Sequence, residues 1–136
     1  MVGKVIVYYK PTPYLALRNT WVFTVLRRVG YVIVFVRNMD STLNFWVNKL
    51  GLQARYSSEE WSEIELENLV IGLHRSGETV PRDTGIVFET GNIEALVSEL
   101  RRRGVDVSEP RDIGVGLEAT FKDPEGNIYR IFQPSK

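Results

Sequence analysis

Two stretches of this sequence carry apolar residues at the spacing of an amphipathic helix, and both stand in the same order of elements. The apolar positions follow i, i+3, i+4, i+7, which places them on one face of a helix. The first set is Leu43, Trp46, Val47 and Leu50, and the second is Ile93, Leu96, Val97 and Leu100. Each helix is expected after one strand and before three short strands. A βαβββ order therefore occurs twice, at a spacing of about fifty residues.

The expected strands are short runs rich in β-branched and aromatic residues. Tyr31–Val36 is apolar on both faces, which predicts a central strand. The first helix is expected to begin at Asp40 or Ser41, since either side chain can cap it, and to end before Gly51. The other expected strands span 53–56, 61–66 and 69–74 in the first half, and 86–88, 105–107, 116–121 and 128–132 in the second half.

These elements predict one α+β domain over residues 29–136. Its two βαβββ half-modules, 29–76 and 84–134, are expected to form a curved mixed sheet around a cleft. Neither half can bury its helical stripe alone, so the halves must pack together. The cleft that this leaves is the expected ligand site. The polar stretch 75–84 is expected to be a linker, and residues 1–28 are expected to be an extra strand or an N-terminal arm.

Composition excludes several classes of function. Seventeen Lys and Arg residues balance seventeen Asp and Glu residues in 136 residues, so a general electrostatic binder of nucleic acid is not expected. The chain has no cysteine, which excludes disulfides, thiolate catalysis and cysteine-bound zinc. No apolar run approaches the roughly 20 residues of a membrane span, and Lys and Arg interrupt the N-terminal stretch. The expectation is a cytoplasmic protein with no membrane contact.

Three segments of the sequence resemble the vicinal oxygen chelate superfamily, which comprises glyoxalases, bleomycin resistance proteins and dioxygenases. Residues 30–52 resemble its opening strand and helix, and residues 99–105 resemble its second helix with the following strand. The turn at residues 123–127, continuing to Gln133, resembles its terminal hairpin. The resemblance covers residues 29–134 and implies the fold expected above, with a ligand cleft between the two halves.

The resemblance also implies four metal-ligand positions, at which family members carry His, Gln or Glu. Here those positions hold Tyr31, Gly72, Gly85 and Arg130. None is a normal ligand of a divalent metal, and the permanent charge of Arg130 would repel a cation. The expectation is therefore a family member without the usual metal and without a cofactor, with a cation in place of a metal.

Six residues are candidate ligand-binding residues: Tyr31, Trp61, His74, Glu89, Glu118 and Arg130. Each could instead have a purely structural role. Tyr31 could bind a ligand or hydrogen-bond Arg130. Trp61 could be an aromatic platform or a core residue. His74, the only histidine, could be a general base, a displaced metal ligand or simply a strand-end residue. Arg130 could anchor an anion or form an internal ion pair, with Glu118, Glu89, Glu63 or Glu65 as its expected carboxylate partner.

Three functions remain open. The first is a metal-independent protein that binds a small molecule in its cleft, with anions among the candidate ligands, as the resemblance to bleomycin-resistance-like members implies. The second is a lyase, isomerase or dioxygenase whose metal is held by a non-standard set that includes His74 and a Glu. The third is a structural or regulatory protein whose cleft is packed shut by Tyr31, Phe35, Arg130 and Trp61. Family members generally dimerise or fuse two domains, so the resemblance implies a homodimer.

Overall fold

The computed structural model describes residues 25–136, and the expected elements within residues 1–24 lie outside the described residues. The first half contains strands β1 (Tyr31–Val36), β2 (Gln53–Tyr56), β3 (Trp61–Glu65) and β4 (Val70–Arg75), with helices α2 (Met39–Leu43) and η1 (Asn44–Lys49) after β1. The second half contains β5 (Asp83–Glu89), α3 (Ile93–Arg102), β6 (Asp106–Val107), β7 (Arg111–Asp112), β8 (Gly116–Lys122) and β9 (Ile128–Pro134). The two βαβββ half-modules are therefore confirmed, with β7 as an added short strand.

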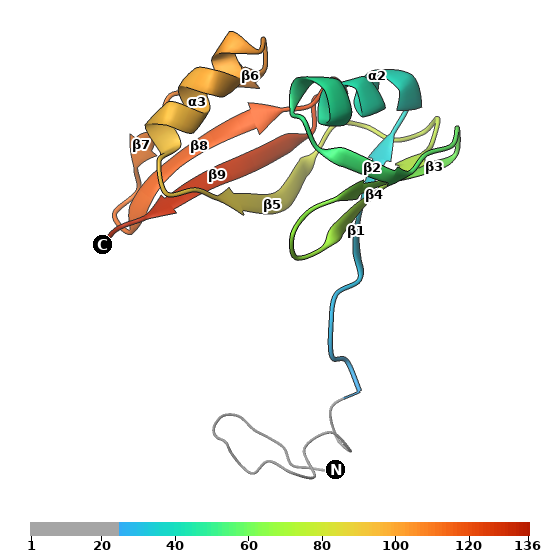
Figure 1. The fold of residues 1–136 in the computed structure, drawn as a ribbon, viewed down its shortest axis with the longest axis horizontal. Coiled ribbons are helices and arrows are strands. Elements are labelled where there is room, and N and C mark those ends of the chain that lie inside the picture. The colour runs from blue at the N-terminus through green and yellow to red at the C-terminus, as the bar shows by residue number, and fades with distance from the viewer. Residues whose placement is uncertain (1–24) are drawn as a thin grey trace.

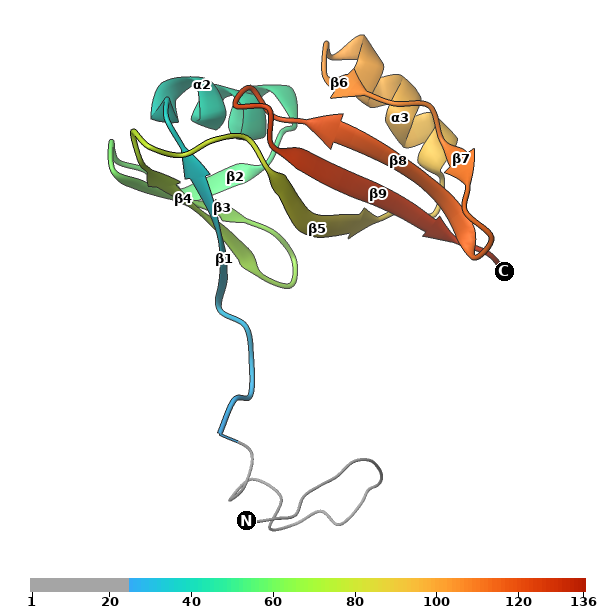
Figure 2. The ribbon, with the colours of Figure 1, turned by 180° about the vertical axis from the view of Figure 1, so that it is seen from behind.

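The strands form two mixed sheets. The first has the order β1-β4-β3-β2, and the second has the order β5-β9-β8-β6 with β7 paired to β8. In each half the first strand runs parallel to the last strand, β1 to β4 and β5 to β9, while the other pairs are antiparallel. Both helical segments lie on the same side of the sheets (Figures 1 and 2).

The prediction that Tyr31–Val36 is a central strand is wrong for the single chain. Within the described residues β1 pairs only with β4 and lies at the edge of its sheet. Val34 and Val36 are buried beneath the helices, whereas Tyr31, Ile33 and Phe35 remain 47%, 49% and 39% exposed. One apolar face of the strand joins the core, while nothing within residues 25–136 covers the other face.

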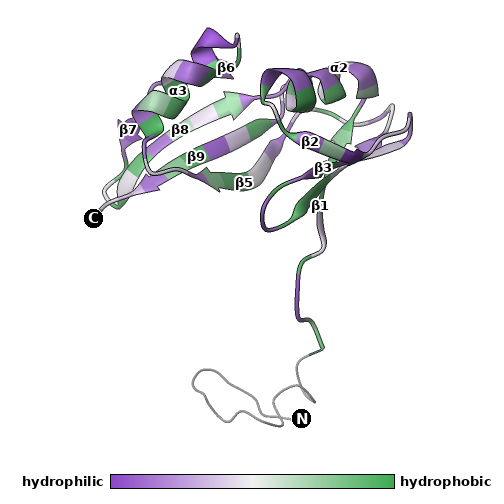
Figure 3. Cartoon of the chain, in the orientation of Figure 1, coloured by the Kyte–Doolittle hydropathy of each residue, from purple (hydrophilic) through white to green (hydrophobic). Residues whose placement is uncertain are grey.

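One hydrophobic core joins the two halves on the helix side of the sheets. Trp46 is fully buried, and its ring centroid lies 5.3 Å from that of Tyr129 and 6.3 Å from that of Phe88, both in the second half. Phe45 contacts Phe121 across the same boundary, with ring centroids 6.3 Å apart. The sides of both helices that face away from the sheets are largely hydrophilic (Figure 3). Each helix thus buries its apolar stripe in a core that neither half could build alone.

The helix termini follow local capping rules. The side chain of Asn38, rather than Asp40 or Ser41 as expected, caps α2 by accepting a 3.0 Å hydrogen bond from the Ser41 amide. The helix then widens into the π-helix η1, in which the Leu50 amide donates to the Phe45 carbonyl at 2.9 Å. This widening turns Phe45 into the core beside Trp46, which the regular α-helical spacing did not predict.

The expected turn between β8 and β9 is confirmed, and a buried carboxylate organises it. Asp123 is 5% exposed and accepts hydrogen bonds from the Glu125 and Asn127 amides at 2.9 and 3.0 Å. The hydroxyl of buried Tyr129 donates to the same carboxylate at 2.8 Å. Glu125 in turn accepts a 2.8 Å hydrogen bond from the Asn38 amide, which ties this turn to the first half.

No helix within residues 25–136 has both the length and the apolar character to cross a membrane.

Candidate functional site

The face of the first sheet that points away from the helices carries three of the six predicted site residues, namely Tyr31, Trp61 and His74. We call it the open face. The pairing registers Ile33 to Gly72, Phe35 to His74, Trp61 to His74 and Glu63 to Gly72 put these side chains on one side of the sheet, because paired residues share a face. The open face is thus defined by Tyr31, Ile33, Phe35, Arg55, Trp61, Glu63, Gly72 and His74.

The six-membered ring of Trp61 occupies the space directly above Gly72. A Cβ at Gly72 would be only 2.2 Å from Cη2 and 2.7 Å from Cζ2 of the indole, so only glycine leaves room for this ring position. Tyr31 meets the indole edge-on, with ring centroids 5.9 Å apart and planes at 67°. The glycine that replaces a family metal-ligand position therefore has a physical role, which is to seat an aromatic ring in that space.

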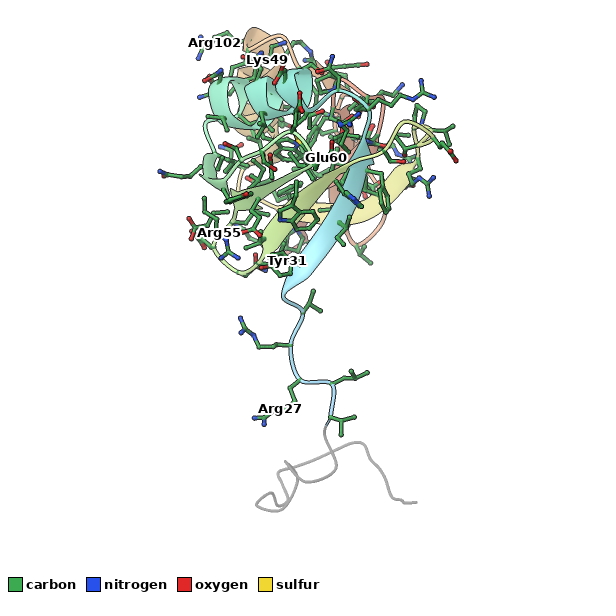
Figure 4. All side chains as sticks on the ribbon, turned by 90° about the vertical axis from the view of Figure 1, so that its right-hand side faces the viewer. Arg27, Tyr31, Lys49, Arg55, Glu60 and Arg102 are labelled. Atoms are coloured by element: carbon green, nitrogen blue, oxygen red, sulfur yellow. The ribbon has the colours of Figure 1, made fainter. Side chains whose placement is uncertain are left out.

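The carboxylate of Glu63 links the indole to a guanidinium group. Its Oε2 accepts a 2.8 Å hydrogen bond from Trp61 Nε1, and its Oε1 accepts a 2.7 Å hydrogen bond from Arg55 Nε. These two contacts, that from Trp61 foremost, hold the pKa of Glu63 below its ordinary value. Arg55 also donates from Nη2 to the Tyr31 hydroxyl at 3.2 Å, so Tyr31 bonds Arg55 instead of the expected Arg130. Figure 4 shows Tyr31 and Arg55 at the same end of the first sheet.

The rings of Tyr31, Trp61, His74 and Phe35 lie next to one another on the open face, and we call them the aromatic row. The ring of His74 lies 5.5 Å from that of Phe35 and 6.1 Å from that of Trp61, centroid to centroid, and the residue is exposed. Within residues 25–136 no group of three or more His, Cys, Asp or Glu side chains is arranged to hold a metal ion. The aromatic neighbours of His74 and the poor ligands at the family positions do not fit a divalent metal.

Arg130 belongs to a separate cluster on the second sheet. Its two terminal nitrogens each donate to one carboxylate oxygen of Asp83 at 2.6 Å, a bidentate ion pair, and its Nε lies 3.7 Å from Oε2 of Glu118. The hydrogen bonds from Arg130, with one from the Gly85 amide, lower the pKa of Asp83 from 3.8 to about 2. The guanidinium charge is thus balanced inside the protein, which favours the internal ion pair over an anion anchor.

Asp83 was not among the expected partners of Arg130, because it falls within the stretch expected to be a linker. Of the predicted carboxylates, Glu118 lies nearby, whereas Glu63 pairs with Arg55 on the other sheet. Glu89 shares the face of Arg130, since it pairs in register with Phe132, two residues along β9. Within residues 25–136 no ion pair joins Glu89 to Arg130. The sequence did contain a signal for this ion pair. Strands 86–88 and 128–132 were both expected, and Asp83 lies just before the first of them.

The four family metal positions fall on two sheets in this chain. Tyr31 and Gly72 lie in the first sheet, and Gly85 and Arg130 lie in the second. Across residues 25–136, no hydrogen bond, ion pair or aromatic contact joins the cluster around Trp61 to the cluster around Arg130. Direct contacts within residues 25–136 therefore do not join the four positions, and their lining of one cleft stays a prediction.

A hollow of about 370 Å³ opens at the end of the first sheet beside Tyr31 and Arg55. Arg28, Glu65 and Glu67 also line it, so positive and negative side chains are balanced around it. Arg55 reaches both the hollow and the aromatic row. A ligand on the open face could therefore extend from the aromatic rings to the guanidinium group.

Comparisons with known proteins agree on the family and the fold. A family model described as the Glyoxalase/Bleomycin resistance protein/Dioxygenase superfamily matches residues 28–131. The uncharacterized protein YetH of Bacillus subtilis (strain 168) is 24% identical over 119 residues, covering 78% of this chain and 98% of that protein.

Two solved structures share the fold at low sequence identity. TnmS3, an antibiotic binding protein from Streptomyces sp. CB03234, aligns with a TM-score of 0.68 at 22% identity, over 82% of this chain and 98% of that one. The bleomycin-binding protein of Streptomyces verticillus, solved with copper(II)-bleomycin, aligns with a TM-score of 0.65 at 15% identity, over 81% and 99% of the two chains.

Proposed function

The chain belongs to the glyoxalase/bleomycin resistance protein/dioxygenase superfamily, and on that premise we propose that it binds a small planar molecule on the open face without the family's metal. The observation that carries this proposal is the seat of Trp61 on Gly72. A ring held over Gly72 by its contacts with Glu63 and Tyr31 offers an aromatic surface whose position is fixed before the ligand arrives.

The exposure of the neighbouring side chains supports a ligand or partner on this face. Tyr31, Ile33 and Phe35 are between 39% and 49% exposed, so the part of the chain from residue 25 onward leaves these side chains accessible. Burying such side chains contributes about 25 cal/mol for each Å² of apolar surface removed from water. Two structural neighbours are described as binding an antibiotic and copper(II)-bleomycin, which accords with a binding role for this scaffold.

Binding to a transition metal is not part of this proposal. The four family positions supply a phenol, two glycines and a guanidinium, and the lone His74 has aromatic neighbours instead of carboxylates. The alternative is a metal-dependent lyase, isomerase or dioxygenase that uses His74 and a Glu. Metal analysis of the purified protein separates the two. A stoichiometric transition metal that is lost in His74→Ala would overturn the metal-independent proposal in favour of the enzyme.

We also infer that a second copy of the chain completes the site. Among residues 25–136 both helical segments lie on the same side of the sheets, and the clusters around Trp61 and Arg130 lie on different sheets. A homodimer could bring the open face of one protomer against the second sheet of its partner. Light scattering should give twice the chain mass, and Phe35→Glu, which puts a charge on the open face, should give a monomer. A monomeric mass for the unaltered chain would contradict the inference.

The binding proposal is tested by thermal-shift measurements with 2-ethylnaphthalene and with bleomycin as probes. A ligand that binds only the folded state raises the melting temperature. Stabilisation should be lost in Trp61→Ala and kept in Ile113→Ala, which removes an exposed apolar side chain in the other half. If neither probe stabilises the protein, or if Trp61→Ala responds as the unaltered chain does, the stacking surface is not the binding site.

A further inference from the structure

Arg55 has hydrogen-bonding capacity that no acceptor within the described residues uses. Its Nε donates to Glu63 and its Nη2 donates to Tyr31. Within residues 25–136 its third nitrogen, Nη1, donates to no protein acceptor. The side chain is 42% exposed, and it lines the hollow that continues from the aromatic row.

The two contacts that Arg55 does make hold its guanidinium in place. Glu63 is only 16% exposed in its side chain and is itself bonded to Trp61, so the ion pair is anchored in the sheet rather than free to rotate. The guanidinium carbon also lies 5.8 Å from the centre of the Tyr31 ring. A planar fork fixed at two corners presents its remaining N–H groups in a defined direction, which favours recognition of one acceptor geometry.

The charges around Arg55 decide which acceptor fits. Glu63 already balances the guanidinium, and in the hollow Glu65 and Glu67 offset Arg28 and Arg55. An anionic group would gain little net attraction here and would meet two carboxylates. A neutral oxygen can accept from Nη1 without that repulsion, because a hydrogen bond to a charged donor does not need a charged acceptor.

We propose that Arg55 is the specificity residue of the open face, and that it selects planar aromatic ligands with an uncharged carbonyl oxygen at their edge. The aromatic body stacks on Trp61 while the carbonyl accepts from Nη1 of Arg55. Glu63 is a positioning residue, because it holds the indole and the guanidinium in a fixed relation. This inference rests on the proposed stacking function and adds the chemical class of the ligand.

The test compares three probes that share a naphthalene body: 2-acetylnaphthalene, which carries a neutral carbonyl, 2-ethylnaphthalene, which lacks the oxygen, and 2-naphthoate, which is anionic. Dissociation constants are measured by equilibrium dialysis with the full chain. The ketone should bind roughly tenfold tighter than the hydrocarbon, the size expected for one hydrogen bond to a charged donor. The carboxylate should bind no tighter than the ketone.

The variants assign that preference to Arg55. In Arg55→Gln the ratio of ketone to hydrocarbon affinity should fall close to one, and Arg55→Lys, which keeps the charge without the planar fork, should lose most of the preference. Arg75→Gln is the control, since Arg75 is equally exposed at 42% and also pairs with a glutamate, Glu60, here through both Nε and Nη2. Arg75→Gln should keep the full preference.

The outcomes separate this inference from the function on which it rests. If both naphthalenes bind through Trp61 but with equal affinity, or if Arg55→Gln keeps the preference, the role of Arg55 is wrong while the stacking function stands. Naphthoate binding more tightly than the ketone would contradict the neutral-acceptor assignment and indicate an anion site. If no probe binds, both proposals fail.

Discussion

Because Trp61 occupies the space above Gly72, we predict that the effect of Gly72→Ala on the free energy of unfolding changes sign when Trp61 is removed. In Gly72→Ala the new Cβ would lie 2.2 Å from Cη2 of the indole. Carbon atoms in ordinary contact are about 3.5–4.0 Å apart, so the ring must move by roughly 1.3 Å or more. That movement strains the 2.8 Å hydrogen bond from Trp61 to Glu63. Overpacking of this kind costs about 1–3 kcal/mol.

The same substitution should have the opposite effect when the ring is absent. The φ angle of Gly72 is not among the positive values found in this chain, so an alanine can adopt its backbone conformation. Replacing such a glycine stabilises a protein by about 0.4–1 kcal/mol, because the unfolded chain loses conformational freedom. Gly72→Ala should therefore destabilise the unaltered chain and stabilise Trp61→Ala, a reversal that measures the contact directly.

Four proteins are compared: the unaltered chain, Gly72→Ala, Trp61→Ala and the variant with both substitutions. Urea unfolding at one protein concentration, followed by far-ultraviolet circular dichroism, gives their free energies of unfolding. Gly77→Ala is the control, since a Cβ there meets nothing within 4 Å and its φ is not positive. It should have the same effect with and without Trp61. If Gly72→Ala changes stability equally in both backgrounds, the indole does not occupy the space above Gly72 and the reasoning for the aromatic platform is refuted.

Three further predictions concern the buried turn, the ion pair and the metal. Tyr129→Phe removes a buried hydrogen bond of 2.8 Å to Asp123 and should lower the free energy of unfolding by about 1–3 kcal/mol in urea titrations; no loss would mean that the Asp123 carboxylate is satisfied without it. The pKa of Asp83 is lowered from 3.8 to about 2, so its contribution to stability is complete above pH 3.8 and is lost as pH falls through about 2. The stability difference between the unaltered chain and Asp83→Asn should therefore shrink over that interval, and a difference independent of pH would contradict the role of Arg130. Dialysis against EDTA should leave the melting temperature unchanged, whereas a fall restored by one added metal would show a structural or catalytic metal site.

Periodic apolar residues were enough to predict the two half-modules. Of the four positions of α3 expected from helical spacing, Ile93, Val97 and Leu100 are buried and Leu96 is half-buried. The turn at residues 123–127 also lies where expected, since its residue types favour a turn in any context. Such local signals depend on residues close in sequence, and they survive folding because a helix or turn is made by its own neighbours.

Residues far apart in sequence, by contrast, met in ways that no local pattern indicated. Trp61 lies on Gly72 because β3 and β4 pair in one particular register, and Arg55 reaches Glu63 across a β-bulge in the β2–β3 pair. The parallel pairing of β5 with β9 brings Arg130 into an ion pair with Asp83, although Asp83 lies in the stretch that was expected to be a linker. A register shift of one residue would have turned each of these side chains to the opposite face.

By itself, then, the sequence determined which residues of each helix and strand are apolar, and from that the order and class of the elements. It also predicted, through the resemblance, that Tyr31, Gly72, Gly85 and Arg130 stand where family members carry metal ligands. Only the tertiary structure decided what covers each apolar face, and here it left Tyr31, Ile33 and Phe35 of β1 exposed at a sheet edge. The physical reason is that periodicity records the polarity of a face, whereas the partner of that face depends on long-range packing. The candidate site, built from Trp61, Glu63 and Arg55, is a product of that packing.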